Sequence, residues 1–381
     1  MSNTDNKLMA WVMGGVVIFC SILIALVVAE FATRLFDLIS PPMPRTWREI
    51  SLSSPPPPPY RDADYDVTQL SFERNNVTWK ADDKYGYRAA DINGSYINIV
   101  DGVRVTTGSP SNPKHRVWVF GGSTIMCQEV PDRYTVPSQI QRLLNEKSPE
   151  TYQVINLGAT SLTTKHQLWR LLNDAHGLGN GDIVIFYDGV NDIIQSLYYK
   201  NPTGTMISAN RQQIEGGGLS RKAIFFLYGK LGDHSAFVRR FLYPFNPDVR
   251  KVEFPKELVE QMKRSYISNI SEASVYAKKK GAVFYHFIQP SLYSVNAPTE
   301  WEKSLLLNGL LYPLELREVY AVGYPALKDA NNELQIRGIS SVDVTGVFNV
   351  KSSDIFLDGF HVNESGNSII SKAILANINI N

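Results

Sequence analysis

Short apolar runs alternate with helical patterns along most of the chain. Runs of strand length span residues 116–120, 152–157, 182–187, 282–288 and 340–344. Helical periodicity follows at 137–146, 164–176, 256–280, within 301–330 and at 364–378. Runs such as residues 182–187 are almost continuously apolar, as is typical of parallel strands buried on both faces. Parallel neighbours need a crossover that is usually a helix. The alternation therefore predicts a three-layer α/β domain with a mainly parallel, five-stranded sheet.

The N-terminus carries a long uncharged segment, Leu8 to Ala29. At about 1.5 Å per residue it is long enough to cross a hydrocarbon layer of ~30 Å. A cleaved signal peptide is the main alternative, but the run is longer than usual for one, and Glu30 to Phe36 contains no clear small-residue cleavage site. A buried core helix is less favoured. We expect residues 1–36 to form a short tail and one transmembrane helix.

Charges flanking this segment bear on its orientation. The N-terminal side has Lys7 against Asp5, and the other side carries Arg34, Arg45 and Arg48. Counted strictly, the positive-inside rule favours a cytoplasmic body. These arginines are interspersed with acidic residues and trail away from the membrane. An anchor followed by a spacer suits work on cell-envelope glycans, so we predict a catalytic domain outside the cytoplasm, periplasmic or at the cell surface.

Four further segments complete the predicted organisation. Residues 37–60 are rich in proline and are expected to form a semi-rigid polyproline II spacer, an SH3-type ligand being the weaker alternative. Residues 61–114 precede the main domain as an extension of unassigned role. The domain itself covers 115–381, with an insertion at about 195–255 that is a lid, an acceptor-binding loop or a structural excursion.

Composition narrows the classes of partner. Lys and Arg total 38 against 37 Asp and Glu, so no global field draws in nucleic acid. Cys20 lies in the apolar N-terminal run and Cys127 in the body, which makes a disulfide between them implausible. No pattern of cysteine and histidine has the spacing of a zinc site. We expect neither a metal nor another cofactor.

Four strand ends carry residues suited to chemistry. In open parallel sheets, functional groups gather beyond the carboxyl ends of the strands. Ser123 follows two glycines after the first strand, and Gly158 ends the second. The third strand leads into Gly189, Asn191 and Asp192. Taken alone, each of these turns is more often structural than catalytic.

The last motif lies near the C-terminus. Asp358 precedes His361 by three residues, a separation at which a carboxylate can fold back to orient an imidazole and stabilise its cation. The other histidines have no carboxylate at this spacing and are interpreted as surface or packing residues: His115, His166, His176, His234 and His286. Gln289 ends the fourth strand, where it either lines a pocket or only terminates the strand.

Together the four segments resemble the blocks of the SGNH, or GDSL-type, hydrolases over about residues 117–378. The resemblance implies a flavodoxin-like sheet and a serine esterase site. Ser123 would be the nucleophile, His361 the general base and Asp358 the residue that orients it. The Ser123 amide, the Gly158 amide and the Asn191 side chain would form the oxyanion hole. Gly122, Gly189, Asp192 and Gln289 are candidate pocket residues.

One departure concerns the first block, which reads Gly121-Gly122-Ser123-Thr124 instead of G-D-S. Members of the family with Gly-Gly-Ser-Thr exist, and the departure favours a subgroup that works on surface glycans over secreted lipases. The leading prediction is therefore a membrane-anchored esterase that removes O-acetyl or similar acyl groups from carbohydrate. The alternatives are an O-acetyltransferase supplied by an acyl-donor membrane protein, a lipid esterase or thioesterase, and a non-catalytic glycan-binding module.

Overall fold

The computed structural model describes residues 3–39, 56–82, 86–202, 235–237, 254–307, 316–350 and 353–380. Its contacts divide the chain into two compact units. One comprises Met1–Met43 and Gln213–Val249, and the other comprises Pro44–Gln212 and Arg250–Asn381. We call the second unit the body.

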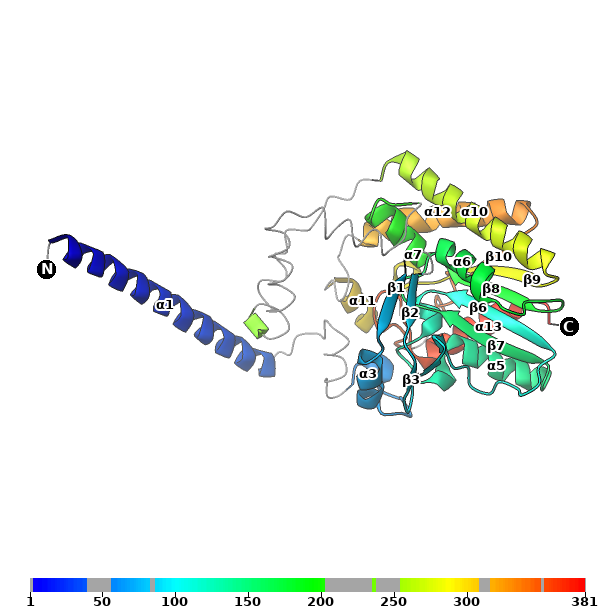
Figure 1. The fold of residues 1–381 in the computed structure, drawn as a ribbon, viewed down its shortest axis with the longest axis horizontal. Coiled ribbons are helices and arrows are strands. Elements are labelled where there is room, and N and C mark those ends of the chain that lie inside the picture. The colour runs from blue at the N-terminus through cyan, green and yellow to red at the C-terminus, as the bar shows by residue number, and fades with distance from the viewer. Residues whose placement is uncertain are drawn as a thin grey trace. The chain divides into compact units, whose positions relative to one another are not determined.

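The first unit contains the long helix α1, Asn3–Ile39 (Figure 1). Within it, Trp11–Phe36 is long and apolar enough to span a membrane, and its side chains are largely exposed, with Thr33 buried. A signal sequence has the same properties, so anchoring stays a prediction. The Glu30 carboxylate accepts hydrogen bonds from the Ser235 hydroxyl and the Ala236 and Phe237 amides, at 2.7, 3.0 and 3.1 Å. This part of the predicted insertion therefore folds with α1 and not with the body.

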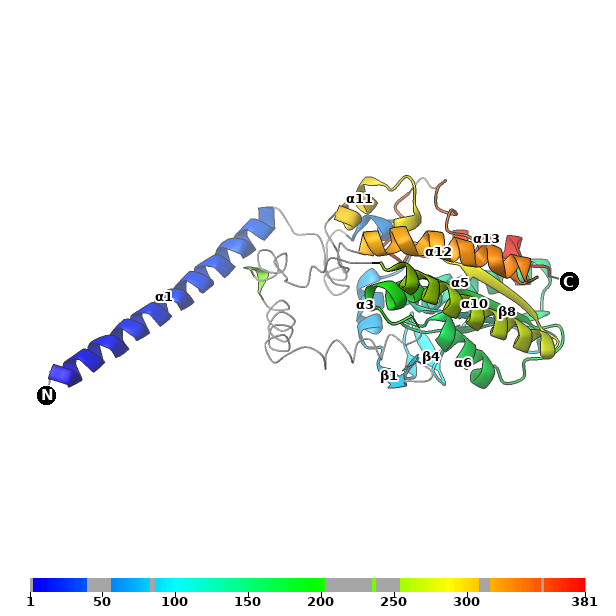
Figure 2. The same cartoon turned by 90° about the horizontal axis from the view of Figure 1, so that it is seen from above.

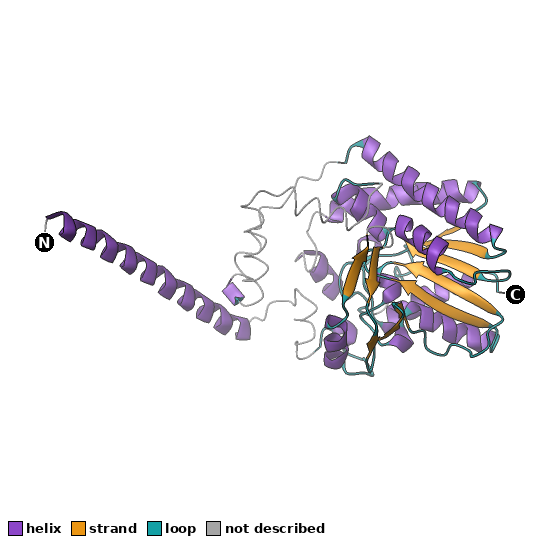
Figure 3. Cartoon of the chain, viewed as in Figure 1, coloured by secondary structure: helices purple, strands orange, loops and turns teal. Residues whose placement is uncertain are grey.

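The body is built on an eight-stranded sheet (Figure 3). Its parallel strands are β6 His115–Gly121, β7 Tyr152–Gly158, β8 Ile183–Asp188, β9 Val283–Ile288 and β10 Ser340–Asp343. Their spatial order is β10-β9-β8-β6-β7. Numbered along the chain this is the flavodoxin-like order 2-1-3-4-5, with β6 and β8 adjacent at the point where the order reverses. The predicted fold class and all five parallel strands are confirmed.

Three short strands extend the sheet beyond β7: β5 Val103–Arg104, β4 Asn98–Val100 and β3 Ile92–Asn93. They are antiparallel, which makes the sheet larger than the predicted five strands. Helix α3, Val67–Asn75, and a separate hairpin of β1 Trp79–Asp82 and β2 Gly86–Ala89 belong to the same part of the chain. The extension at 61–114 is thus an integral part of the body.

Helices cover the sheet. Contacts pair α5 Val136–Lys147 with α13 Glu364–Ala376, and they pair α10 Lys256–Lys279 with both α6 Thr164–Asp174 and α12 Leu316–Ile336. Figure 2 shows α10 and α12 running alongside each other. The helix α11, Glu300–Leu307, precedes α12. Each predicted helical segment is present, and residues 301–330 hold parts of two helices.

The α6, α10 and α12 side encloses the larger core. Phe120, Phe186 and Phe284 come from three neighbouring strands, and successive ring centroids lie 5.3 and 5.2 Å apart. They pack in one cluster with buried side chains of α6, α10 and α12. Because aromatic rings bury a large apolar area, this row fixes the register of the central strands against the helices.

The end of the proline-rich segment does not behave as a spacer. Residues 40–55 lie outside the described part of the chain, but Pro58–Tyr60 form a short 3-10 helix on the body. The Tyr60 ring is buried against Leu357, and its hydroxyl donates to the Glu129 carbonyl at 2.7 Å. Burial of the ring and this hydrogen bond override the extended preference of the prolines. The boundary between spacer and body therefore lies before residue 58.

Arg104 ties the antiparallel extension to the segment after the first strand. Its guanidinium is buried and forms an ion pair with Asp132 at 2.8 Å. It also donates to the carbonyls of Met126, Cys127 and Val130. A single side chain thus satisfies the backbone of a loop that would otherwise bury unpaired carbonyl groups.

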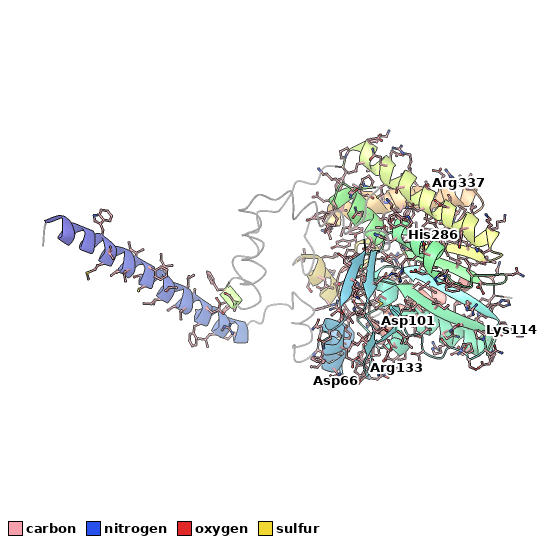
Figure 4. The ribbon with its side chains drawn as sticks, viewed as in Figure 1. Asp66, Asp101, Lys114, Arg133, His286 and Arg337 are labelled. Carbon is pink, nitrogen blue, oxygen red and sulfur yellow. The ribbon has the colours of Figure 1, made fainter. Side chains whose placement is uncertain are left out.

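Arg104→Met is expected to lower the free energy of unfolding by about 3 to 5 kcal/mol, because it removes the buried cation that pairs with Asp132 and that donates to three carbonyls. Chemical denaturation of the full chain in detergent measures this. The matched control is Arg133→Met, whose partner Asp64 is on the surface (Arg133 is labelled in Figure 4) and whose loss should have a much smaller effect. Equal effects of the two substitutions would contradict the role given to Arg104.

Candidate active site

Ser123 is the first residue of the four-residue helix α4, Ser123–Met126, directly after β6. The preceding Gly122 is needed for a close approach, since a Cβ added to it would lie 2.5 Å from the Asn191 side-chain nitrogen. The Ser123 hydroxyl is partly exposed, whereas the following residues Ile125 and Met126 are buried. The turn therefore presents a hydroxyl at the end of a rigid buried strand.

His361 connects this hydroxyl to a carboxylate. Its Nε2 lies 2.8 Å from Ser123 Oγ, and its Nδ1 lies 2.7 Å from Asp358 Oδ2. Asp358 is fully buried, and its other oxygen accepts the backbone N–H groups of Phe360 and His361. A bridge between Phe356 and Val362 closes this loop. The two halves of the predicted triad therefore meet in one hydrogen-bonded chain.

The interaction between Asp358 and His361 shifts the pKa values of both residues. Burial acts to raise the pKa of Asp358, but the neighbouring imidazole and the two backbone donors hold it below its ordinary value of 3.8. Burial acts to lower the pKa of His361, but the charges of Asp358 and Glu129 outweigh it and raise that pKa to about 9. The imidazolium is thus the stabilised form.

Asn191 follows β8 in the helix α7, Val190–Ile193. Its side-chain amide donates to the Leu162 carbonyl at 2.9 Å. An amide carries two N–H groups, and this bond uses one of them. Together with the close approach to Gly122, this places an amide donor beside the turn that carries Ser123.

Gly158 is placed differently from the expectation. Its amide donates to the side chain of Asn156, two residues earlier, at 3.0 Å. A Cβ at Gly158 would lie 2.4 Å from the Met126 nitrogen, so the glycine allows α4 to pack onto β7. The single N–H of Gly158 is engaged by Asn156, so the role of this amide as an oxyanion donor stays a prediction.

Of the remaining candidate pocket residues, Gln289 lies against the turn that carries Ser123, whereas Gly189 and Asp192 contact other segments. Gly189 begins α7 with a φ of 114°, and Gln289 is buried with its side-chain oxygen 3.5 Å from the Thr124 hydroxyl. Asp192 is buried and accepts both the amide and the hydroxyl of Thr164, at 3.0 and 2.6 Å. Asp192 therefore fixes the start of α6 and does not line the cavity beside Ser123.

One histidine outside the triad has a carboxylate neighbour that the sequence does not reveal. His286, labelled in Figure 4, is a fully buried packing residue of β9. Its Nε2 lies 3.2 Å from the Asp188 carboxylate and 2.9 Å from the Tyr266 hydroxyl. Its carboxylate neighbour comes from the adjacent strand and not from nearby in the chain. His234 lies outside the described residues.

Three residues near the site carried no recognisable signal in the sequence. Glu129 is buried with a carboxylate oxygen 3.9 Å from His361 Nε2, and Arg74 lies 3.4 Å from the same oxygen. Ser161, in the loop after β7, has a φ of 57°. Such a conformation is uncommon for a residue other than glycine and is enriched at functional sites.

A small cavity of about 10 Å³ adjoins the imidazole. Its polar walls come from the segment after β6 and from the C-terminal loop. Apolar side chains from the segments that follow β9 and β10 complete the walls. The lining residues include Thr124, Cys127, Glu129, Pro290, Phe348, Phe360 and His361. The volume is close to that of one water-sized group. The arrangement provides a hydroxyl nucleophile, a base, an orienting carboxylate and an amide donor, which are the components of acyl transfer.

Comparison with solved structures finds distant similarity. An acetylxylan esterase from Geobacillus stearothermophilus is 14% identical, with 71% of this chain and 96% of that chain covered at a TM-score of 0.39. A lipolytic protein of the G-D-S-L family from Veillonella parvula is 12% identical, with 69% and 97% covered at 0.39. An α/β hydrolase from the metagenome of Lake Arreo is 14% identical, with 72% and 96% covered at 0.37.

No family model and no curated protein matches the sequence. The G-D-S-L family, to which the Veillonella protein is assigned, is the one that the four sequence motifs resemble. The similarity is too distant to carry a substrate over to this chain.

The rate at which a fluorophosphonate labels Ser123 should rise as the pH increases from 6.5 toward 9 and level off above it. Only the neutral imidazole accepts the Ser123 proton, and the pKa of His361 is raised. Intact-protein mass spectrometry over a series of pH values measures the rate. A plateau already reached at pH 6.5 would contradict the raised pKa.

Proposed function

We propose that the chain is a serine esterase of the SGNH type that removes O-acetyl or similar small acyl groups from a cell-envelope carbohydrate. The observation that carries the proposal is the continuous chain of hydrogen bonds from Ser123 through His361 to Asp358, at 2.8 and 2.7 Å. A serine hydroxyl is a poor nucleophile until an adjacent base takes its proton, and this geometry supplies that base.

In the first half of the proposed reaction, Ser123 Oγ attacks the ester carbonyl while His361 Nε2 takes the hydroxyl proton. Asp358 stabilises the imidazolium from the Nδ1 side. The negative charge that develops on the carbonyl oxygen is stabilised by the Ser123 backbone N–H and the Asn191 side chain, each such donor being worth about 3 kcal/mol. His361 then gives its proton to the departing sugar oxygen as the carbon–oxygen bond breaks, so that the sugar leaves as an alcohol and the acyl group stays on Ser123.

In the second half, a water molecule replaces the alcohol. His361 Nε2 takes a proton from the water as its oxygen attacks the acyl carbon. The tetrahedral intermediate collapses, the Ser123 oxygen recovers the proton from His361, and the carboxylic acid leaves. The same Asn191 and Ser123 donors serve both halves, because the developing charge is on the same oxygen each time.

The small size of the acyl group is supported by the cavity beside His361. With about 10 Å³, it holds one water-sized group, which fits a small acyl group such as acetyl. The membrane-length helix α1 supports an envelope location. The proposed side is extracytoplasmic, and protection of the body from added protease in intact spheroplasts would refute it.

Ser123→Ala should lower the rate of 4-nitrophenyl acetate hydrolysis at least about 10³-fold, because no acyl-enzyme forms without the hydroxyl. The same substitution should abolish acetate release from an acetylated oligosaccharide. Rates are measured on the full chain in detergent at a pH near 9, where His361 is available as a base.

The matched control is Ser109→Ala, at an exposed serine of the extension, which should leave both rates unchanged. Equal midpoint temperatures of thermal unfolding for wild type and both variants would exclude a folding defect. Hydrolysis by Ser123→Ala at the wild-type rate would refute the proposed function.

A further inference from the structure

A second carboxylate lies beside the catalytic imidazole, on the side opposite Asp358. Glu129 Oε1 is 3.9 Å from His361 Nε2, the nitrogen that also faces Ser123 Oγ. Only 4% of the Glu129 side chain is exposed, so water screens this charge poorly. The proposed reaction uses Asp358 and does not require a carboxylate at this position.

The backbone of the loop that carries Glu129 is fixed by the N-terminal part of the body. The Tyr60 hydroxyl donates to the Glu129 carbonyl at 2.7 Å. Arg104 donates to the carbonyls of Met126 and Val130 on either side of it, both at 2.7 Å. These two side chains hold Glu129 in a buried position. Burying a charged side chain costs free energy unless the charge is paired with an opposite one.

The carboxylate also has a cationic neighbour. Arg74 comes from α3, and its guanidinium lies 3.4 Å from Glu129 Oε1 with 16% of its side chain exposed. Arg74 therefore neutralises part of the charge that His361 experiences. Glu129 lies between two cations, one fixed on Arg74 and one that exists on His361 only when the imidazole is protonated.

Several other titratable groups surround His361 in the described part of the chain. Asp358 belongs to its own loop and holds Nδ1. Ser123 comes from α4. Cys127, after α4, and Tyr187, from β8, line the same cavity, and burial raises the pKa of both so that they stay neutral. Glu129 and Arg74 are thus the charges that act on the Nε2 side.

We infer that Glu129 is a positioning residue that stabilises the protonated form of His361 from the Nε2 side, and that Arg74 limits this effect. The inference deepens the proposed function and rests on it for its catalytic meaning. No covalent step is added: His361 Nε2 accepts and releases the protons as in the proposed reaction, and Glu129 keeps its charge throughout.

The balance of these charges has opposite consequences at two stages. An anion at about 4 Å favours the imidazolium, which assists proton transfer from Ser123 as the acyl carbon is attacked. The same anion keeps the resting imidazole protonated at neutral pH, where it cannot act as a base. Glu129 therefore shifts activity toward alkaline pH, while Arg74 shifts it back toward neutrality.

Glu129→Gln and Arg74→Gln test the inference because both remove one charge from the same pair. In ¹⁵N-histidine-labelled full chain in detergent, NMR titration should show the His361 midpoint moving down by about one pH unit in Glu129→Gln. It should move up in Arg74→Gln. The pH profile of fluorophosphonate labelling should shift in the same two directions.

Three controls separate charge from structure. Glu146→Gln removes a carboxylate that is 58% exposed on α5 and should leave the His361 midpoint unchanged. Glu129→Asp keeps the charge and should keep most of the raised midpoint. If Glu129→Gln does not fold, Arg74→Gln and Glu129→Asp still decide the matter, since a structural role predicts no rise in the midpoint when Arg74 is removed.

Unchanged midpoints, or shifts of both charge-removing variants in the same direction, would overturn the inference. Failure of the proposed function would look different. The wild-type protein would then hydrolyse no ester, while the His361 midpoint would still fall in Glu129→Gln and rise in Arg74→Gln.

Discussion

The hydrogen bond between His361 Nε2 and Ser123 Oγ joins segments separated by 238 residues, and the architecture of the body serves to make it possible. Ser123 directly follows β6, a strand in the middle of the sheet whose last part, Val117–Gly121, is buried. His361 lies on a loop that is closed by its own carboxylate, Asp358, and by the Phe356–Val362 bridge. Because the backbone around both Ser123 and His361 is fixed, aligning the hydroxyl with the imidazole costs little conformational entropy.

The N-terminal part of the body supports this alignment indirectly. Arg104 and Tyr60 fix the backbone between α4 and α5, and Arg74 lies against the carboxylate that this loop presents to His361. Residues 61–114, to which the sequence alone assigned no role, therefore place a charged side chain close to the site. The antiparallel strands that carry Arg104 extend the parallel sheet at the β7 edge, where the order of strands allows a side chain to reach the loop after α4.

The sequence predicts those parts of the fold that have strong periodicity. Strands such as Ile183–Asp188 are long, apolar and buried on both faces, and their positions follow from the pattern alone. Strands β3 and β5 have two residues each, too few for any periodicity to be detected. The residues of the proposed triad could be singled out because the motifs resemble the blocks of one family and those at strand ends converge at one edge of a parallel sheet.

Contacts that depend on the exact arrangement of side chains could not be predicted. Asn156 occupies the Gly158 amide, and no feature of the sequence distinguishes that from a free donor. His286 meets Asp188 because β8 and β9 are neighbours in a particular register. Glu129 reaches His361 only after α3, α4 and the C-terminal loop have packed together, so its proximity has no signature in chain spacing.

The central claim is that Ser123 is a nucleophile activated by His361. Locating a fluorophosphonate adduct by peptide mass spectrometry tests it most directly, with wild type and His361→Gln compared at equal fold stability. The account predicts one adduct on Ser123 in folded wild type and a large loss of labelling in His361→Gln. An adduct on another residue, or equal labelling of Ser123 with and without the imidazole, would contradict it.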